Sequence, residues 1–233
     1  MKPRFVGRLG MADVVTVANA ALGFVAAVAA TLDIQIAARL ILVGAIADGL
    51  DGVVARKRGS TPAGEYLDSM ADVASFGVAP AAITAIAAIE TWGRTDPLLL
   101  GIAVGVPAVY VAMAVTRLGL YTAYDVGHDE TEGVQTTLAA TVIAAAVLAG
   151  VGETSLLLAG IAVFAVLMVT TVTYPDLHAQ DATVMGLIQA LAVLVPDLWG
   201  RVFPFALLFL ACGYLLLGPR FYWRDYLDWD GLG

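Results

Sequence analysis

The fold is decided by the stretch from residue 48 to residue 72. It reads Asp48-Gly49-Leu50-Asp51-Gly52-Val53-Val54-Ala55-Arg56 and, after a short basic loop, Gly64-Glu65-Tyr66-Leu67-Asp68-Ser69-Met70-Ala71-Asp72. Its aspartates lie among apolar residues, where an unpaired charge is costly. If both flanks are helical, Asp48 and Asp51 share one helix face, and Asp68 and Asp72 share a face of the next helix. Two helices joined by a short loop pack as antiparallel neighbours, so these carboxylates are expected to converge into a site for hard divalent cations.

The composition is that of a membrane protein. The 233 residues are 60% hydrophobic and only 14% charged, and the apolar residues come in runs near the length needed to cross a bilayer. We therefore expect one all-α, polytopic membrane domain over residues 1–233. The net charge of −8, without a long basic cluster, argues against a nucleic-acid partner.

Eight crossings are predicted, with a window of about 20 residues for each. They fall at about 12–31, 34–54, 69–91, 97–116, 134–151, 155–173, 184–195 and 202–217. The helices expected to carry the carboxylate site are those at 34–54 and 69–91, and the C-terminal helices occupy 134–217. Because Pro196 and Gly200 interrupt the last pair, it forms either two crossings or one re-entrant hairpin.

The distribution of basic residues predicts the orientation, because cytoplasmic loops collect Lys and Arg. If both termini are cytoplasmic, the outside holds only Arg39, Arg94 and Arg201. The inside then holds Lys2, Arg4, Arg8, Arg56, Lys57, Arg58, Arg117, Arg220 and Arg224. We therefore expect both termini, and the loop that separates the two aspartate pairs, to face the cytoplasm.

The opening stretch follows the pattern D-x-x-D-G-x-x-A-R, then a loop, then G-x-x-x-D-x-x-x-D. The positions that match are Asp48, Asp51, Gly52, Ala55, Arg56, Gly64, Asp68 and Asp72. This resembles the signature of the CDP-alcohol phosphatidyltransferase family. Its members are integral membrane enzymes that transfer a phosphate-linked group from a CDP-alcohol to an acceptor hydroxyl and release CMP. The resemblance implies this activity for the chain, and it also implies a homodimer.

The aspartates supply hard anionic oxygens for one or two Mg²⁺ or Mn²⁺ ions, and the predicted ligands are Asp48, Asp51, Asp68 and Asp72. These ions would neutralise a pyrophosphate and the charge on the departing CMP. In the family, the last aspartate of the motif is the general base, and the resemblance implies this catalytic role for Asp72. An acceptor alcohol needs such a base, because its pKa is too high for it to ionise unaided.

Four further motif positions are predicted to bind the CDP-lipid. Gly52 and Ala55 leave room for a nucleotide against the helix backbone. Arg56 can fork onto a phosphate or a carboxylate. Gly64 begins the second helix, where backbone N–H groups favour an anion.

The residues after the motif predict the acceptor. The run Val73-Ala74-Ser75-Phe76-Gly77-Val78-Ala79-Pro80 resembles the phosphatidylserine synthase branch of the family, and the resemblance extends over about residues 14–140. It implies serine as acceptor, with Arg117 as candidate contact for the serine carboxylate and Ser75 as a second acceptor-binding candidate. Arg117 is equally well explained as a positive-inside anchor. Gly77 and Pro80 predict a loosened or kinked helix at mid-membrane.

Other readings stay open at this point. The chain departs from the branch by lacking its prolines near Gln135 and Thr137 and its second basic residue soon after Arg117, which leaves the acceptor pocket open. The same aspartates would serve transfer to glycerol phosphate or inositol phosphate, which requires a basic pocket for the acceptor phosphate. A polytopic transporter or membrane scaffold is the alternative from another class, because intramembrane acids also mark ion pathways. The acidic, salt-adapted composition favours CDP-archaeol over CDP-diacylglycerol as donor, and archaetidylserine as product.

Overall fold

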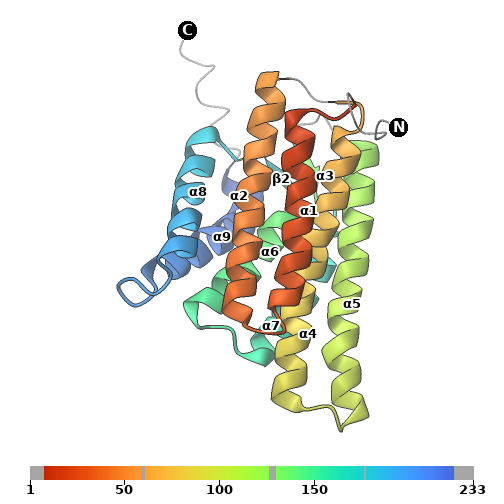
Figure 1. Ribbon diagram of the computed structural model, residues 1–233, viewed down its shortest axis with the longest axis vertical. Helices are drawn as coiled ribbons and strands as arrows, with labels where there is room; N and C mark the ends of the chain where they lie inside the picture. Colours follow the sequence, from red (N-terminus) through yellow and green to blue (C-terminus); the bar gives the residue numbers. More distant parts are fainter. Residues whose placement is uncertain (1–7, 59–60, 126–129, 176, 223–233) are drawn as a thin grey trace, which may run out of the picture.

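The computed structural model describes residues 8–58, 61–125, 130–175 and 177–222. These residues form a helical bundle (Figure 1). The motif lies on α2 (Ile34–Arg58) and α3 (Gly64–Asp72), and α1 (Met11–Ala29) packs against both helices. A π-helical segment, η1 (Val73–Val78), joins α3 to α4 (Ala79–Trp92). The helix α5 (Pro97–Leu120) ends in a second π-helical segment, η2 (Tyr121–Asp125).

The C-terminal part contains shorter helices and a small ribbon. The helices are α6 (Thr136–Ala149), α7 (Thr154–Leu167), α8 (Ala179–Leu194) and α9 (Val202–Phe221). The strands β1 (Glu130–Glu132) and β2 (Thr173–Pro175) pair antiparallel, with Thr131 opposite Tyr174. The ribbon therefore ties the segment after α5 to the segment before α8.

The described residues form eight helical segments in the predicted order, if α3, η1 and α4 are counted as one segment and α5 with η2 as another. The expectation of a helical membrane protein is confirmed, and the short β-ribbon is an addition to it. Four of the segments are long and apolar enough to cross a membrane: Met11–Ala29, Gly64–Trp92, Pro97–Asp125 and Val202–Phe221. The helices α6 and α7 have 14 residues each. At 1.5 Å per residue this is about 21 Å, less than the hydrocarbon core of about 30 Å. Gly150 ends α6 in a left-handed conformation, with φ of 79°, so this helix stops short of the predicted 134–151.

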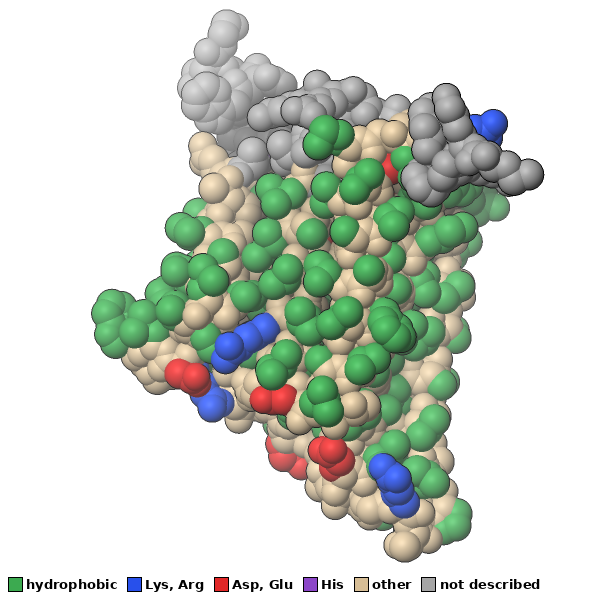
Figure 2. All heavy atoms as spheres, in the orientation of Figure 1, with side chains coloured by type: hydrophobic (Ala, Val, Ile, Leu, Met, Phe, Trp, Pro, Cys, Tyr) green, Lys and Arg blue, Asp and Glu red, His purple; other side chains and the backbone are tan. Residues whose placement is uncertain are grey.

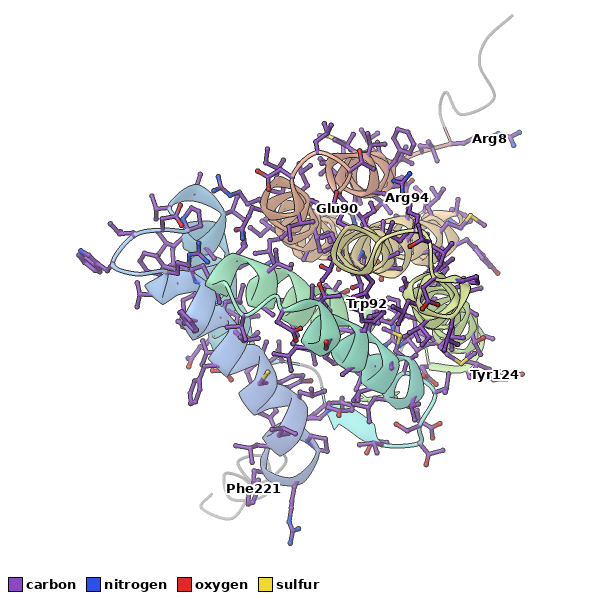
Figure 3. All side chains as sticks on the ribbon, turned by 90° about the horizontal axis from the view of Figure 1, so that it is seen from below. Arg8, Glu90, Trp92, Arg94, Tyr124 and Phe221 are labelled. Atoms are coloured by element: carbon purple, nitrogen blue, oxygen red, sulfur yellow. The ribbon has the colours of Figure 1, made fainter. Side chains whose placement is uncertain are left out.

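The surface agrees with a membrane setting. Apolar side chains cover the middle of the face shown in Figure 2, and charged side chains gather below them. Seen from below, Glu90, Trp92 and Arg94 lie where α4 turns into α5, as Figure 3 shows.

The interior is closely packed: a Cβ atom on Gly23 of α1 would lie 2.6 Å from the backbone of Ala74 and Ser75. Helix α1 can approach η1 so closely only because residue 23 has no side chain.

Candidate active site

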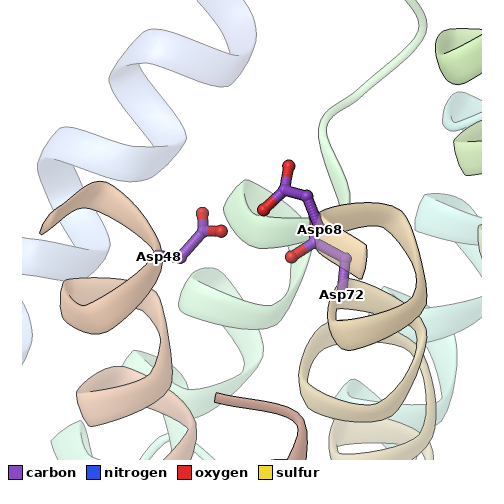
Figure 4. A group of neighbouring side chains, drawn as sticks. All are labelled: Asp48, Asp68 and Asp72. Atoms are coloured by element: carbon purple, nitrogen blue, oxygen red, sulfur yellow. The ribbon is translucent and has the colours of Figure 1, made fainter. Parts of the chain in front are cut away.

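Three of the four predicted aspartates meet. Asp48 comes from α2, and Asp68 and Asp72 come from α3, one turn apart. One ligand oxygen from each lies within 4.8 Å of the other two, and Figure 4 shows the carboxylates facing one another across the space between the helices. Asp72 is buried, whereas Asp48 and Asp68 are half-buried. The predicted convergence of the two helices is therefore confirmed for these three residues.

This donor set suits a hard cation. Three carboxylates brought together repel one another unless protons or cations balance them, and oxygen-only donor sets are those that Mg²⁺ and Mn²⁺ prefer. The fourth predicted ligand, Asp51, follows Asp48 by one turn of the same helix. Its side chain lies outside the described residues, as do those of Ala55 and Arg56.

The start of α3 is tied to α1 by an aspartate that sequence reasoning missed. The Asp13 side chain is buried, and its Oδ2 atom accepts hydrogen bonds from the backbone N–H of Gly10 at 2.7 Å and from the hydroxyl of Thr61 at 2.8 Å. Gly64 begins α3 as predicted, and a Cβ atom there would lie 3.4 Å from Asp13 Oδ1. The signal in the sequence was an acid at the start of an otherwise apolar helix. Asp13 thus links α1 to the loop in front of the second half of the motif.

Arg117 interacts electrostatically with Asp72. It is in the last turn of α5 with an exposed fraction of 7%, and its guanidinium interacts electrostatically with Asp72 and Asp125. The guanidinium carbon also lies 5.1 Å from the centre of the Tyr121 ring, within the range of a cation–π contact. A buried cation thus interacts electrostatically with Asp72.

A second polar contact to Asp72 comes from α6. The hydroxyl of Thr136, which is fully buried in the first turn of α6, donates to Asp72 Oδ2 at 3.5 Å. The distance is long for a hydrogen bond between two oxygens. Sequence reasoning did not select Thr136, since 64 residues separate it from Asp72.

Ser75 is engaged elsewhere. Its side chain is buried, and its hydroxyl donates to the backbone carbonyl of Asn19 in α1 at 2.8 Å. This contact links η1 to α1. The acceptor-binding role of Ser75 stays a prediction.

A cavity of about 540 Å³ lies between α2, α6, α8 and α9. It is lined by Ala45 and Gly49 of α2, by Gln135 at the N-cap of α6 and by Leu138 of α6, and none of the three carboxylates is among its lining residues. This volume is within the range of small-ligand sites. The cavity is therefore large enough to hold a small ligand.

Comparison with known proteins places the chain in a family. Residues 9–174 match the CDP-alcohol phosphatidyltransferase family. The chain is 31% identical over 181 residues to archaetidylserine synthase of Methanothermobacter thermautotrophicus, which covers 75% of this chain and 73% of that protein.

Two relatives are named CDP-diacylglycerol–serine O-phosphatidyltransferase. The one from Saccharomyces cerevisiae is 45% identical over 92 residues, or 36% of this chain and 33% of its own length. The one from Helicobacter pylori is 33% identical over 147 residues, or 59% of each chain. With its apolar helices, the chain is a multi-pass membrane enzyme, and it belongs to the CDP-alcohol phosphatidyltransferase family.

Proposed function

We propose that the protein transfers a phosphatidyl-type group from a CDP-lipid to the hydroxyl of L-serine and releases CMP. The observation that carries the proposal is the meeting of Asp48, Asp68 and Asp72, with ligand oxygens within 4.8 Å of one another. A group of carboxylates that can bind metal ions suits a reaction that must bind and stabilise a pyrophosphate.

The carboxylates are proposed as metal ligands. Asp48, Asp68 and Asp72, with Asp51 as the predicted fourth, would hold one or two Mg²⁺ or Mn²⁺ ions, which neutralise the pyrophosphate and the charge on the departing CMP. Gly52, Ala55, Arg56 and Gly64 are proposed to bind the donor. The motif residues would thus bind both the metal ions and the CDP-lipid.

Asp72 is proposed as the general base. It accepts the proton of the serine hydroxyl while that oxygen forms a bond to the lipid-side phosphorus. The bond from this phosphorus to the CMP oxygen breaks, and CMP leaves with the bonding electron pair. Arg117, which interacts electrostatically with Asp72, is proposed to bind the serine carboxylate and so bring the hydroxyl to the base.

Serine is favoured as acceptor because the three relatives are named as synthases of serine lipids. CDP-archaeol is the proposed donor, since the relative with the widest coverage is named archaetidylserine synthase. We further propose that the carboxylates and both termini face the cytoplasm, and that the enzyme is a homodimer.

The test is CMP release by the purified protein from CDP-archaeol and from CDP-diacylglycerol, with Mg²⁺ or Mn²⁺. Serine, glycerol phosphate and inositol phosphate are compared as acceptors, and a sample with chelator is the control. We expect CMP with serine and a divalent ion, and none with chelator. Release only with a phosphorylated acceptor would contradict the choice of serine, and no release with any acceptor would favour a transporter or scaffold.

A further inference from the structure

The segment η1 breaks the regular helix directly after Asp72. The backbone N–H of Ala79 donates to the carbonyl of Ala74, five residues earlier, so η1 is wider than an α-helical turn. A π-turn accommodates one more residue than an α-turn, and each residue of an α-helix turns the chain by about 100°. The presence of η1 therefore sets the direction in which α3 presents Asp68 and Asp72, relative to the part of the helix anchored in α4.

Pro80 supplies a reason for the wide turn. In a regular α-helix the carbonyl of Phe76 would accept from the N–H of residue 80, but proline has no N–H, and its ring clashes with the carbonyl four residues before it. A buried carbonyl left without a donor is costly. The sequence thus removes the α-helical donor of the Phe76 carbonyl, and a replacement donor lowers this cost.

Tyr110 of α5 provides that donor. Its side chain is fully buried, and its hydroxyl donates to the carbonyl of Phe76 at 2.8 Å. On the other side, η1 is held by the Ser75 hydroxyl on the Asn19 carbonyl and by the close approach of Gly23. The wide turn is therefore clamped between α5 and α1.

We propose that Tyr110 is a positioning residue for the metal site: its hydroxyl keeps η1 in the wide-turn form, and η1 in turn directs Asp68 and Asp72 toward Asp48. Without this hydrogen bond, the buried carbonyl drives the segment toward other turn geometries, and the carboxylates lose their common orientation. The inference rests on the proposed metal-dependent function, but ion binding can be measured without turnover.

The test is Mn²⁺ binding to the purified full chain, followed by electron paramagnetic resonance, in the variant Tyr110→Phe. Removing one buried hydrogen bond is expected to weaken Mn²⁺ binding about fivefold or more. The matched control is Thr84→Val. Thr84 is also fully buried and donates its hydroxyl to a carbonyl of the same helix, that of Pro80, at 3.0 Å, but it lies outside η1.

Equal Mn²⁺ affinities in the two variants would overturn the proposal, since the loss would then reflect general destabilisation. A second variant, insertion of one alanine between Asp72 and Val73, adds a residue to the regular helix before η1 and should rotate Asp68 and Asp72 by about 100° relative to η1. It is expected to abolish Mn²⁺ binding, and normal binding by this variant would also overturn the proposal. If Tyr110→Phe weakens Mn²⁺ binding but the unaltered protein releases no CMP with serine, the proposed function fails and the positioning role stands.

Discussion

The two π-helical segments make a useful comparison, because each follows a residue of the site and they are held differently. The segment η1 follows Asp72, and its residues Ser75, Phe76 and Gly77 are buried between α1 and α5. The segment η2 follows Arg117 by a few residues and contains no buried residue. Packed segments open less readily than exposed ones. We therefore expect the carboxylate side to be the more rigid one and the segment after Arg117 to be the more adjustable one.

The largest effect is expected from Asp72→Asn, on the rigid side. Loss of a general base lowers the turnover of an enzyme by about 10²- to 10⁴-fold, whereas an amide of the same size keeps the shape of the site. CMP release should therefore fall by this factor, and CDP-lipid binding should be largely kept. The measurement pairs a CMP-release assay with a binding assay for the CDP-lipid.

The matched control for this substitution is Asp96→Asn. Asp96 caps the N-terminus of α5 by accepting from the backbone N–H groups of Leu98 and Leu99, and asparagine caps a helix equally well. This variant should keep full turnover. A near-normal rate for Asp72→Asn would instead remove Asp72 as the base.

Arg117→Ala tests the adjustable side and should have a smaller, selective effect. If Arg117 binds the serine carboxylate, its loss should raise the KM for serine about tenfold, as expected for a charge-assisted contact worth about 1.5 kcal/mol. The KM for the CDP-lipid should change little. Steady-state kinetics with each substrate varied in turn measures both values.

Arg220→Ala is the control for a positive-inside anchor, since Arg220 is exposed in the last turn of α9. Equal increases in both KM values for Arg117→Ala would identify an anchoring role. The adjustable side would then have no special role in binding the acceptor.

The sequence predicted the helices and the carboxylate site, but not the residues that hold them in place. The helices and the meeting of Asp48 with Asp68 and Asp72 were predictable, because spacings of three and four residues fix a helix face and a short loop fixes the pairing. Gly77 and Pro80 indicated a loosened helix, and η1 is the form that it takes. The partners of this region were not predictable. Tyr110 lies 34 residues from Phe76, and such contacts depend on how whole helices pack.

The crossings were less well predicted than the site. Hydropathy marks where apolar residues begin and end, but a helix ends where its backbone leaves the helical conformation. Gly150 ends α6 in this way although apolar residues surround it. The predicted spans 134–151 and 155–173 therefore exceed the 14-residue helices α6 and α7.

The smallest effect is expected from Thr136→Val, which tests whether α6 also supports Asp72. Valine keeps the branched shape and removes only the hydroxyl that reaches Asp72 Oδ2 at 3.5 Å. Because this contact is long, its loss should lower kcat for CMP release only about threefold. Thr136→Ser, which keeps the hydroxyl, should retain kcat within about twofold. Equal losses in the two variants would show that packing by the methyl group matters instead, and unchanged rates in both would confine the support of Asp72 to η1 and Arg117.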